Sequence, residues 1–221
     1  MCGRFTITVN KEELIEQFTL QLFPEDYSPS YNVAPSQKVL SAVHAAGGRR
    51  AGFLKWGLVP FWVKDPKKWK PLINARSESL HEKPSFKHLL AKKRCVIFAD
   101  SFYEWSIRDG SRTPYRILLT DGKPFAFAAL WDRNRHGEQE ITTCTIITTS
   151  PNEKMATVHD RMPVILQGEA VEKWLNTERY PYQEVKDLLR PLDNDAITMY
   201  QVSTIVNSPK NNSPECIKRV I

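Results

Sequence analysis

The second residue of the chain, Cys2, has the clearest potential for chemistry. Initiator methionine is generally removed ahead of a small residue, so the mature chain is expected to begin at Cys2, with an α-amine and a thiol on adjacent carbons. The amine has an unperturbed pKa of about 7.7–8.0, and its neutral form attacks an aldehyde to give a Schiff base. The thiol, with a pKa of about 8.5, then adds to the imine carbon and closes a five-membered thiazolidine ring. Cys2 therefore predicts capture of an aldehyde as a thiazolidine, which an internal cysteine cannot form because it lacks the adjacent amine.

Two other interpretations of this N-terminus stay open. In N-terminal-nucleophile hydrolases the cysteine thiolate attacks an amide and the α-amine acts as its base. Glutamine amidotransferases of that kind also begin Met-Cys-Gly, as this chain does. The plainest alternative is an ordinary second-position cysteine without a chemical role. The tripeptide alone does not decide among the three.

The remaining cysteines, Cys95, Cys144 and Cys216, are widely spaced and form no Cys-x-x-Cys pair. This spacing argues against a disulfide framework and against a zinc site. Cys95 and Cys144 lie within apolar, β-branched runs, so we expect them to be small buried residues. Cys2 lies outside any such run.

Six short segments match, in the same order, the motifs of one protein family. They are Cys2-Gly3-Arg4-Phe5, Tyr31-Asn32-Val33-Ala34-Pro35, Pro71-Leu72-Ile73-Asn74-Ala75-Arg76-Ser77-Glu78, Phe98-Ala99-Asp100-Ser101-Phe102-Tyr103-Glu104-Trp105, Val158-His159-Asp160-Arg161-Met162-Pro163 and Val206-Asn207-Ser208. Together they closely resemble the SOS-response-associated peptidase (SRAP) family, whose members are abasic-site-processing proteins of bacteria and animals. Each motif is weak alone, but five or six in the right order, over nearly the whole chain, are highly specific.

The resemblance implies that Cys2 becomes linked to an abasic deoxyribose through a thiazolidine. Four residues match the family's catalytic positions, namely Cys2 as the nucleophile, Asn74, Glu104 and His159. An abasic sugar is mostly a closed hemiacetal, so its opening needs a proton donor and acceptor, roles that suit Glu104 and His159. Asn74 has both a donor and an acceptor and is expected to orient the sugar oxygens without a change of charge.

The resemblance also implies a set of DNA contacts. Guanidinium groups form forked hydrogen bonds with phosphates, and an aromatic ring stacks where a base is missing. The segment between Pro60 and Asn74 is longer and richer in lysine than in many relatives, so either Trp62 or Trp69 is the expected stacking residue. Trp56 is expected in the core. The predicted DNA-binding residues are Arg4, Arg76, Arg161, Trp62, Trp69 and Pro35.

Further properties follow from the resemblance as expectations. The family's peptidase label refers mainly to self-removal of Met1, although a separate aminopeptidase would expose Cys2 equally well. Abasic-site lyase activity is expected as well, because a Schiff base at the anomeric carbon permits β-elimination. The chemistry needs neither a metal nor an organic cofactor. The expected partners are abasic sites in single-stranded DNA and at its junctions with duplex, with no membrane involved. We expect a cytoplasmic monomer that associates with the nucleoid when bound to DNA.

The charge of the chain is concentrated in one stretch. The formal net charge is +6 over 221 residues, yet residues 49–94 hold 13 Lys or Arg against three acids. This stretch also contains Trp56, Phe61, Trp62, Trp69 and Phe86, and basic residues among aromatics are typical of a nucleic-acid surface. A solvated basic face over an aromatic core explains the same composition. A non-covalent module that binds single strands is therefore a third hypothesis for function.

The pattern of apolar residues indicates which elements position these side chains. Asn10 followed by Glu13 is a capping box and begins a helix, and 85–93, 170–175 and 183–189 are expected to be helical. Residues 27–35 are expected to form a loop. Runs rich in β-branched and aromatic residues, bounded by turn residues, predict strands at 38–43, 94–98, 103–107, 115–119, 125–130, 141–149, 163–166 and 197–202.

Many short strands with few helices predict an α+β fold. We expect a single SRAP-like domain over residues 1–221, with a strongly curved, barrel-like, mainly antiparallel sheet and a few flanking helices. Hydrophobic content of 41% and charged content of 25% are ordinary for a soluble globular protein. No apolar run approaches the ~18 residues of a membrane span, and no secretory signal is visible at the N-terminus.

Overall fold

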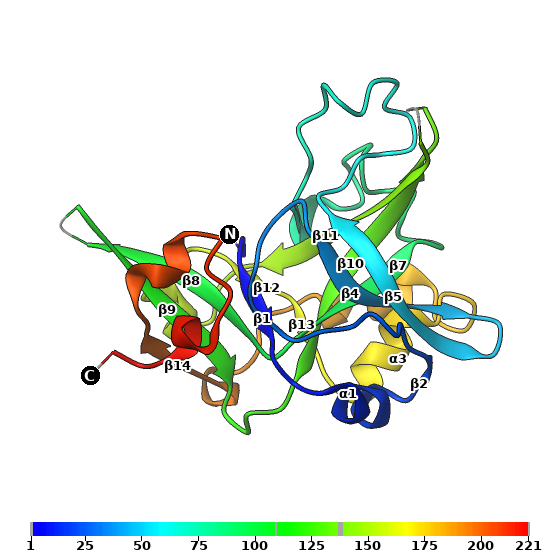
Figure 1. Ribbon diagram of the computed structural model, residues 1–221. Helices are drawn as coiled ribbons and strands as arrows, with labels where there is room; N and C mark the ends of the chain where they lie inside the picture. Colours follow the sequence, from blue (N-terminus) through cyan, green and yellow to red (C-terminus); the bar gives the residue numbers. More distant parts are fainter. Residues whose placement is uncertain (1, 109, 137–138, 221) are drawn as a thin grey trace.

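The chain folds around a small closed β-barrel (Figure 1). The computed structural model describes residues 2–108, 110–136 and 139–220. In order of neighbours, the barrel strands are β11 (Ile141–Thr149), β10 (Phe125–Asn134), β7 (Arg94–Ala99), β4 (Lys38–Ala45) and β5 (Gly48–Trp56). The neighbours are antiparallel until β5 pairs in parallel with β11 and closes the ring. Closure satisfies backbone groups that an open edge would leave unpaired.

A second, antiparallel sheet lies beside the barrel and carries the start of the chain. Its strands are β14 (Ile197–Gln201), β9 (Ser111–Leu119), β8 (Ser101–Arg108), β1 (Phe5–Ile7) and β3 (Ser30–Val33). Only Asp100 separates β7 of the barrel from β8 of the second sheet. Figure 1 shows β8, β9 and β14 on one side of the molecule and the barrel on the other, with β1 between them.

Short strands and helices complete the fold. The short strands are β2 (Leu20–Leu22), β6 (Asn74–Arg76), β12 (Met162–Pro163) and β13 (Ile165–Leu166). The helices are α1 (Lys11–Phe18), α2 (Glu153–Ala156), α3 (Glu169–Leu175) and α4 (Tyr182–Val185), with 3₁₀ turns η1 (Ser77–Ser79), η2 (Lys186–Leu188), η3 (Asn194–Ala196), η4 (Thr204–Asn207) and η5 (Pro214–Ile217). Among the described helices, none has the length and apolar character needed to cross a membrane.

The core explains why these runs form buried strands. Every residue of β7 is buried, and so are the first six residues of β10, whose sequences are correspondingly apolar on both faces. Phe5 of β1 packs its ring against Trp56 and Phe127 of the barrel, with centroids 5.3 and 5.6 Å away. Such tilted and edge-to-face pairs each contribute about 0.5–1.5 kcal/mol beyond area burial. This aromatic cluster fixes the strand that follows Cys2 against the barrel.

The structure confirms the predicted fold class, which is α+β with a barrel-like, mainly antiparallel sheet. The predicted cap of the first helix is present, since the Asn10 side chain accepts a hydrogen bond from the Glu13 N–H at 2.8 Å. Trp56 is fully buried, as expected, and so are Cys95 and Cys144. That the chain is one domain stays a prediction.

Two local predictions are wrong. The expected loop at 27–35 contains β3, because its backbone pairs with β1 and Val33 points into the core. The expected helix at 85–93 is a series of turns with isolated hydrogen bonds, for example from Phe86 N–H to Lys83 O. Its apolar residues Phe86, Leu89 and Leu90 are all buried, so tertiary packing of these side chains outweighs the helical periodicity.

Candidate active site

Strand pairing brings Cys2 next to Glu104. Phe5 of β1 lies opposite Phe102 of β8, and the Tyr103 N–H donates to the carbonyl of Arg4 at 2.9 Å. In an antiparallel pair, the residues before β1 then run alongside those that follow Tyr103. Cys2 is fully buried, and burial followed by the nearby Glu104 charge raises the pKa of its thiol. The thiol is therefore protonated near neutral pH.

Glu104 is a buried carboxyl, only 3% exposed, in the middle of β8. Burial raises its pKa above the usual range, and the nearby His159 partly opposes this effect. A carboxyl in such surroundings retains its proton closer to neutrality, as a general acid requires. The same charge interactions link Cys2, Glu104 and His159 into one group.

His159 reaches this group from the turn that follows α2. Its backbone N–H donates to the carbonyl of Met155 at 2.9 Å, which continues the short helix by one turn. Its ring Nδ1 accepts a hydrogen bond from the Arg161 N–H at 3.0 Å and also lies 2.9 Å from Asp160 Oδ1. A neutral ring that accepts at Nδ1 carries its proton on Nε2.

Asn74 occupies the first position of β6, a three-residue strand that pairs in parallel with β11. Both polar atoms of its side-chain amide are buried, and neither has a hydrogen-bond partner among the described residues. Buried amides normally have partners, since an unsatisfied group costs about 1–3 kcal/mol. A contact between this amide and a ligand stays a prediction.

A cleft of about 360 Å³ opens beside these residues. Its wall includes Glu104 and His159, together with Gly3, the neighbour of Cys2. A larger hollow of about 690 Å³ contains none of the four predicted catalytic residues. Of the four predicted catalytic residues, Glu104 and His159 line the smaller cleft, whereas Cys2 and Asn74 are not among its lining residues. The full lining of the cleft is Gly3, Arg4, Glu104, Trp105, Ile107, Arg112, His159 and Asn207.

The three predicted phosphate-binding arginines differ in their surroundings. Arg76 is exposed on β6. Arg4 donates from Nη1 to Asn32 Oδ1 and to the carbonyl of Val206, both at 2.7 Å, and so fastens the C-terminal segment. Arg161 forms a forked ion pair with Glu78, at 2.8 and 2.9 Å. A phosphate contact stays a prediction for all three, and Arg76 has the most accessible guanidinium.

The two candidate stacking residues lie together. The rings of Trp62 and Trp69 meet edge to face with centroids 5.3 Å apart, and Trp62 is 40% exposed. The indole N–H of Trp69 donates to the carbonyl of Leu58 at 3.3 Å, which holds this ring against the loop. Trp62 is thus the more accessible of the two. Pro35 is half-buried, two residues after the end of β3.

The sequence reasoning missed Arg112 and the role of Trp105 in the wall of the cleft. The Trp105 ring has two guanidinium groups near it, with Arg112 Cζ 4.8 Å and Arg4 Cζ 5.7 Å from its centroid. The hairpin of β8 and β9 places Arg112 on this wall, since Ile107 lies opposite Arg112. The Asp-Gly pair at residues 109–110, a dipeptide typical of hairpin turns, was the available signal in the sequence, although Asp109 itself lies outside the described residues. Met1, whose removal is predicted, also lies outside them.

Comparisons with known proteins agree with one another. The family model described as SOS response associated peptidase (SRAP) matches residues 1–209. The chain is 50% identical to the abasic site processing protein YoqW of Bacillus subtilis, over 99% of each chain. It is 37% identical to the abasic site processing protein HMCES of Gallus gallus, over 86% of this chain and 66% of that protein. A crystal structure of a protein from Bacteroides thetaiotaomicron superposes with a TM-score of 0.83 at 26% identity and covers both chains completely.

Proposed function

The chain belongs to the SOS response associated peptidase family, and we propose that it processes abasic sites in DNA by capturing the sugar aldehyde on Cys2. The names of its relatives YoqW and HMCES support the abasic site as the substrate. The observation that carries the chemistry is the convergence of Cys2, Glu104 and His159 beside one cleft. This group combines a nucleophile that becomes N-terminal when Met1 is removed with two groups able to transfer protons.

The reaction proceeds in three balanced steps. The closed sugar first opens, as one group takes the proton from the C1′ hydroxyl and another protonates the ring oxygen, giving an aldehyde and a free hydroxyl. The Cys2 α-amine then adds to the aldehyde, and loss of one water leaves a Schiff base. The Cys2 sulfur finally adds to the imine carbon, and its proton moves to the nitrogen, which closes the thiazolidine. The net change is the loss of one water.

The raised pKa values fit this order of events. A buried, protonated Cys2 thiol is a poor first nucleophile, because the thiolate is the reactive form. That state disfavours the alternative in which the thiolate attacks an amide, and it favours attack by the amine before the thiol. Glu104 retains a proton that it can deliver when the sugar opens and when water leaves. His159 supplies the complementary base.

Asn74 and the basic surface provide substrate binding in this proposal. The buried amide of Asn74 orients the hydroxyl groups of the sugar, because its donor and its acceptor both lack partners in the described part of the chain. Exposed Arg76, two positions further along β6, contacts the phosphate backbone nearby. The preferred partner is an abasic site in a single strand or at its junction with duplex. That the protein is a cytoplasmic monomer remains our prediction, and so does the removal of Met1, by the protein itself or by a separate aminopeptidase.

Lyase activity competes with capture at the same intermediate. The Schiff base permits β-elimination of the 3′ phosphate, which cleaves the strand. Ring closure by the Cys2 sulfur consumes the imine and so prevents this elimination. The thiazolidine therefore shields the lesion. The ratio of cleaved strand to adduct reports which branch dominates.

The experiment that tests the proposal is intact mass spectrometry of the protein after incubation with a single strand that carries one abasic site. We expect a species equal to the protein without Met1, plus the strand, minus one water. Its loss in Cys2→Ser assigns the bond to the N-terminus. Unmodified protein and intact strand alone contradict the proposal, and Cys2-dependent glutamine or peptide hydrolysis would instead support an amidotransferase or peptidase.

A further inference from the structure

The loop between β5 and β6 carries the most exposed aromatic surface of the protein. Of the aromatic side chains that the structure describes, only Phe61 and Trp62 are exposed, at 49% and 40%. They occupy the two central positions of a turn that is closed by a hydrogen bond from the Val63 N–H to the Pro60 carbonyl at 3.1 Å. Exposed aromatic rings are enriched at surfaces that bind a partner.

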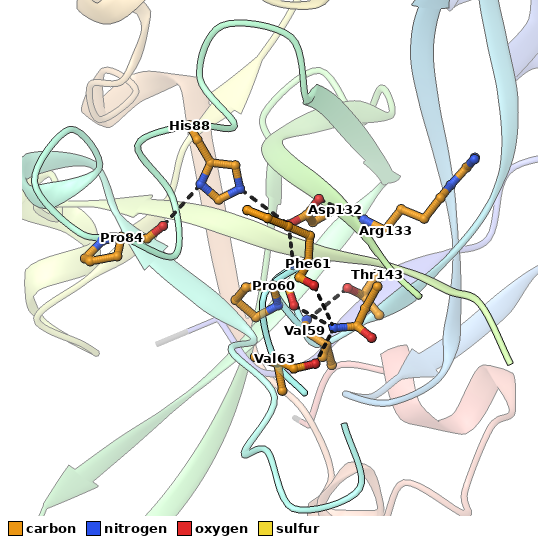
Figure 2. A network of polar contacts seen from close by, with 10 residues as sticks. Val59, Pro60, Phe61, Val63, Pro84, His88, Asp132, Arg133 and Thr143 are labelled. Atoms are coloured by element: carbon orange, nitrogen blue, oxygen red, sulfur yellow. Dashed lines mark hydrogen bonds and ion pairs between the residues drawn. The ribbon is translucent and has the colours of Figure 1, made fainter. Parts of the chain in front are cut away.

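Three buried polar side chains from the barrel hold this turn in place (Figure 2). Thr143 of β11 accepts a hydrogen bond from the Val59 N–H at 2.9 Å, and Asp132 of β10 accepts one from the Phe61 N–H at 2.8 Å. Asn134 of β10 donates to the carbonyls of Pro60 and Val63, both at 2.8 Å. All three side chains belong to residues that are at most 3% exposed.

His88, which lies next to Asp132 in the same network, contacts one side of the Phe61 ring. His88 lies 3.5 Å from the Asp132 oxygen that binds the loop, and its ring meets the edge of Phe61 with centroids 5.0 Å apart. The other ring nitrogen of His88 lies 3.1 Å from the carbonyl of Pro84. Figure 2 shows His88, Asp132 and Phe61 converging at this point. The ring of Phe61 is thus fixed by contacts on one side and open to solvent on the other.

The polar side chains in the barrel wall that support this loop carry a free-energy cost of burial. Burying a carboxylate and an amide is unfavourable unless each is hydrogen-bonded, and here their partners are the backbone groups of the aromatic turn. Apolar side chains of the same size would fill the wall without fixing the turn. The network therefore specifies the position of the turn and of the two rings, Phe61 and Trp62, that it carries.

We propose that Asp132 and Asn134 are positioning residues that fix Phe61 and Trp62 as a rigid stacking surface for a nucleobase next to the lesion. The inference rests on the proposed function, because it assumes DNA as the partner. A base at the end of a duplex, or one that has lost its stacked neighbour at the abasic site, gains a new stacking partner on these rings. A turn that is already ordered loses less conformational entropy when the base binds.

The test is a double-mutant cycle on the affinity for DNA. The probe is a labelled single-strand/duplex junction with a tetrahydrofuran abasic analogue, which lacks the aldehyde, and its binding is followed by fluorescence anisotropy. Asn134→Ala is measured in the wild-type chain and in the Phe61→Ala/Trp62→Ala background. We expect affinity to fall about ten-fold in the first background and less than two-fold in the second, since stacking is worth roughly 1–3 kcal/mol per base.

The cycle separates positioning from a general structural role. An equal loss in both backgrounds, or no loss in either, overturns the proposal. Asn176→Ala is the matched control, because this asparagine also holds a backbone N–H, that of Arg179 at 3.1 Å, in a turn without predicted DNA contacts. It is expected to leave the affinity unchanged. Asp132→Asn, which has nearly the same shape, is taken through the same cycle if Asn134→Ala does not fold.

The outcome also distinguishes this inference from the proposed function. The wild-type protein is assayed in parallel for Cys2-dependent adducts with a strand that carries a true abasic site. If adducts form but Asn134→Ala has the same effect on affinity in both backgrounds, only the positioning role is overturned. Absence of binding to any abasic strand overturns both.

Discussion

The cleft beside Cys2 and the aromatic turn at residues 60–63 contrast in how they are built. The cleft is assembled from strand pairing, which buries Cys2 and Glu104 and raises the pKa of each. The turn has no strand pairing, and buried side chains hold its backbone while its rings face solvent. In the cleft, burial shifts the pKa values of the reactive groups. In the turn, buried side chains fix the position of two exposed aromatic rings. Substitutions in the cleft should therefore change rates, whereas substitutions in the turn and at the predicted phosphate contacts should change affinities.

The largest expected effect is that of Cys2→Ala, which removes the thiol and should abolish the thiazolidine adduct. Non-covalent binding to the same strand should persist, because the basic residues are unchanged. One additional residue at the N-terminus, placed so that Cys2 is no longer the first residue, should also abolish the adduct, since it removes the free amine from Cys2. Gel shift under denaturing conditions measures both variants. Cys95→Ala, which removes a buried thiol from the barrel, is the control and should form adduct normally.

An adduct that survives the N-terminal extension would mean that the thiol reacts alone. In that case the thiazolidine mechanism is wrong, and the cleft would not act through the free α-amine of Cys2. Such an adduct would have the mass of a thioether or hemithioacetal, which mass spectrometry distinguishes.

Glu104→Gln should lower the rate of adduct formation by about 10²–10⁴-fold, the usual contribution of a general acid or base. Because burial raises the pKa of Glu104, the wild-type rate should decline as pH rises through that pKa, and the glutamine variant should lack this limb. Single-turnover rates between pH 5 and 9 measure the difference. A variant that retains the wild-type pH profile would assign the acid to another group.

The raised pKa of Glu104 also predicts a dependence of stability on pH. The folded state holds this proton more tightly than the unfolded state, so its stabilising effect is complete below the unfolded pKa of about 4.3 and is lost as pH rises through the folded pKa. Glu104→Gln removes this loss. We therefore expect the variant to gain in Tm over the wild type by on the order of 2–4 °C at pH 8, and by less at pH 4. Thermal denaturation followed by circular dichroism measures it.

Asn74→Ala should lower the rate of adduct formation by roughly 10–100-fold while leaving the fold as stable as before or more stable. Removal of a buried amide that lacks partners in the described residues relieves an unfavourable burial. Asn32→Ala is the matched control, since Asn32 is buried but binds Arg4 and three backbone carbonyls. It should lower the Tm clearly. A comparable loss of stability in Asn74→Ala would show that its amide is structural.

The same contrast explains what could be predicted from the sequence. The strands of the barrel and the α+β class follow from apolar runs such as 94–99, which are apolar because both faces are buried. Cys2, Glu104 and His159 come from three distant segments, and the motif order predicted their association before any geometry was known. Periodicity could not predict that residues 85–93 would form turns, because the burial of Leu89 and Leu90 is a tertiary effect.

Side-chain support of a loop is harder still to predict. Asp132 and Asn134 lie in a segment whose sequence is typical of the end of a strand. Their partners are backbone groups about 70 residues earlier in the chain. Backbone atoms carry no sequence signature. The intramolecular pairing of Arg161 with Glu78 was missed for a similar reason, since it depends on how β6 and β12 both pair with β11.

Arg76→Ala is expected to have the smallest effect, a loss of affinity of a few-fold that is similar for strands of different sequence. The exposed guanidinium contributes one phosphate contact, so the slope of log affinity against log salt should fall by about one. Arg161→Ala sharpens the comparison, because it breaks the forked bonds to Glu78 and should lower the Tm as well. Titration by anisotropy at several salt concentrations, with a Tm for each variant, separates the two. If Arg161→Ala changed the salt slope without changing the Tm, the Glu78 pair would yield to phosphate when DNA binds. Arg161 would then be a predicted phosphate contact in the same way as the exposed Arg76, and not only a structural residue.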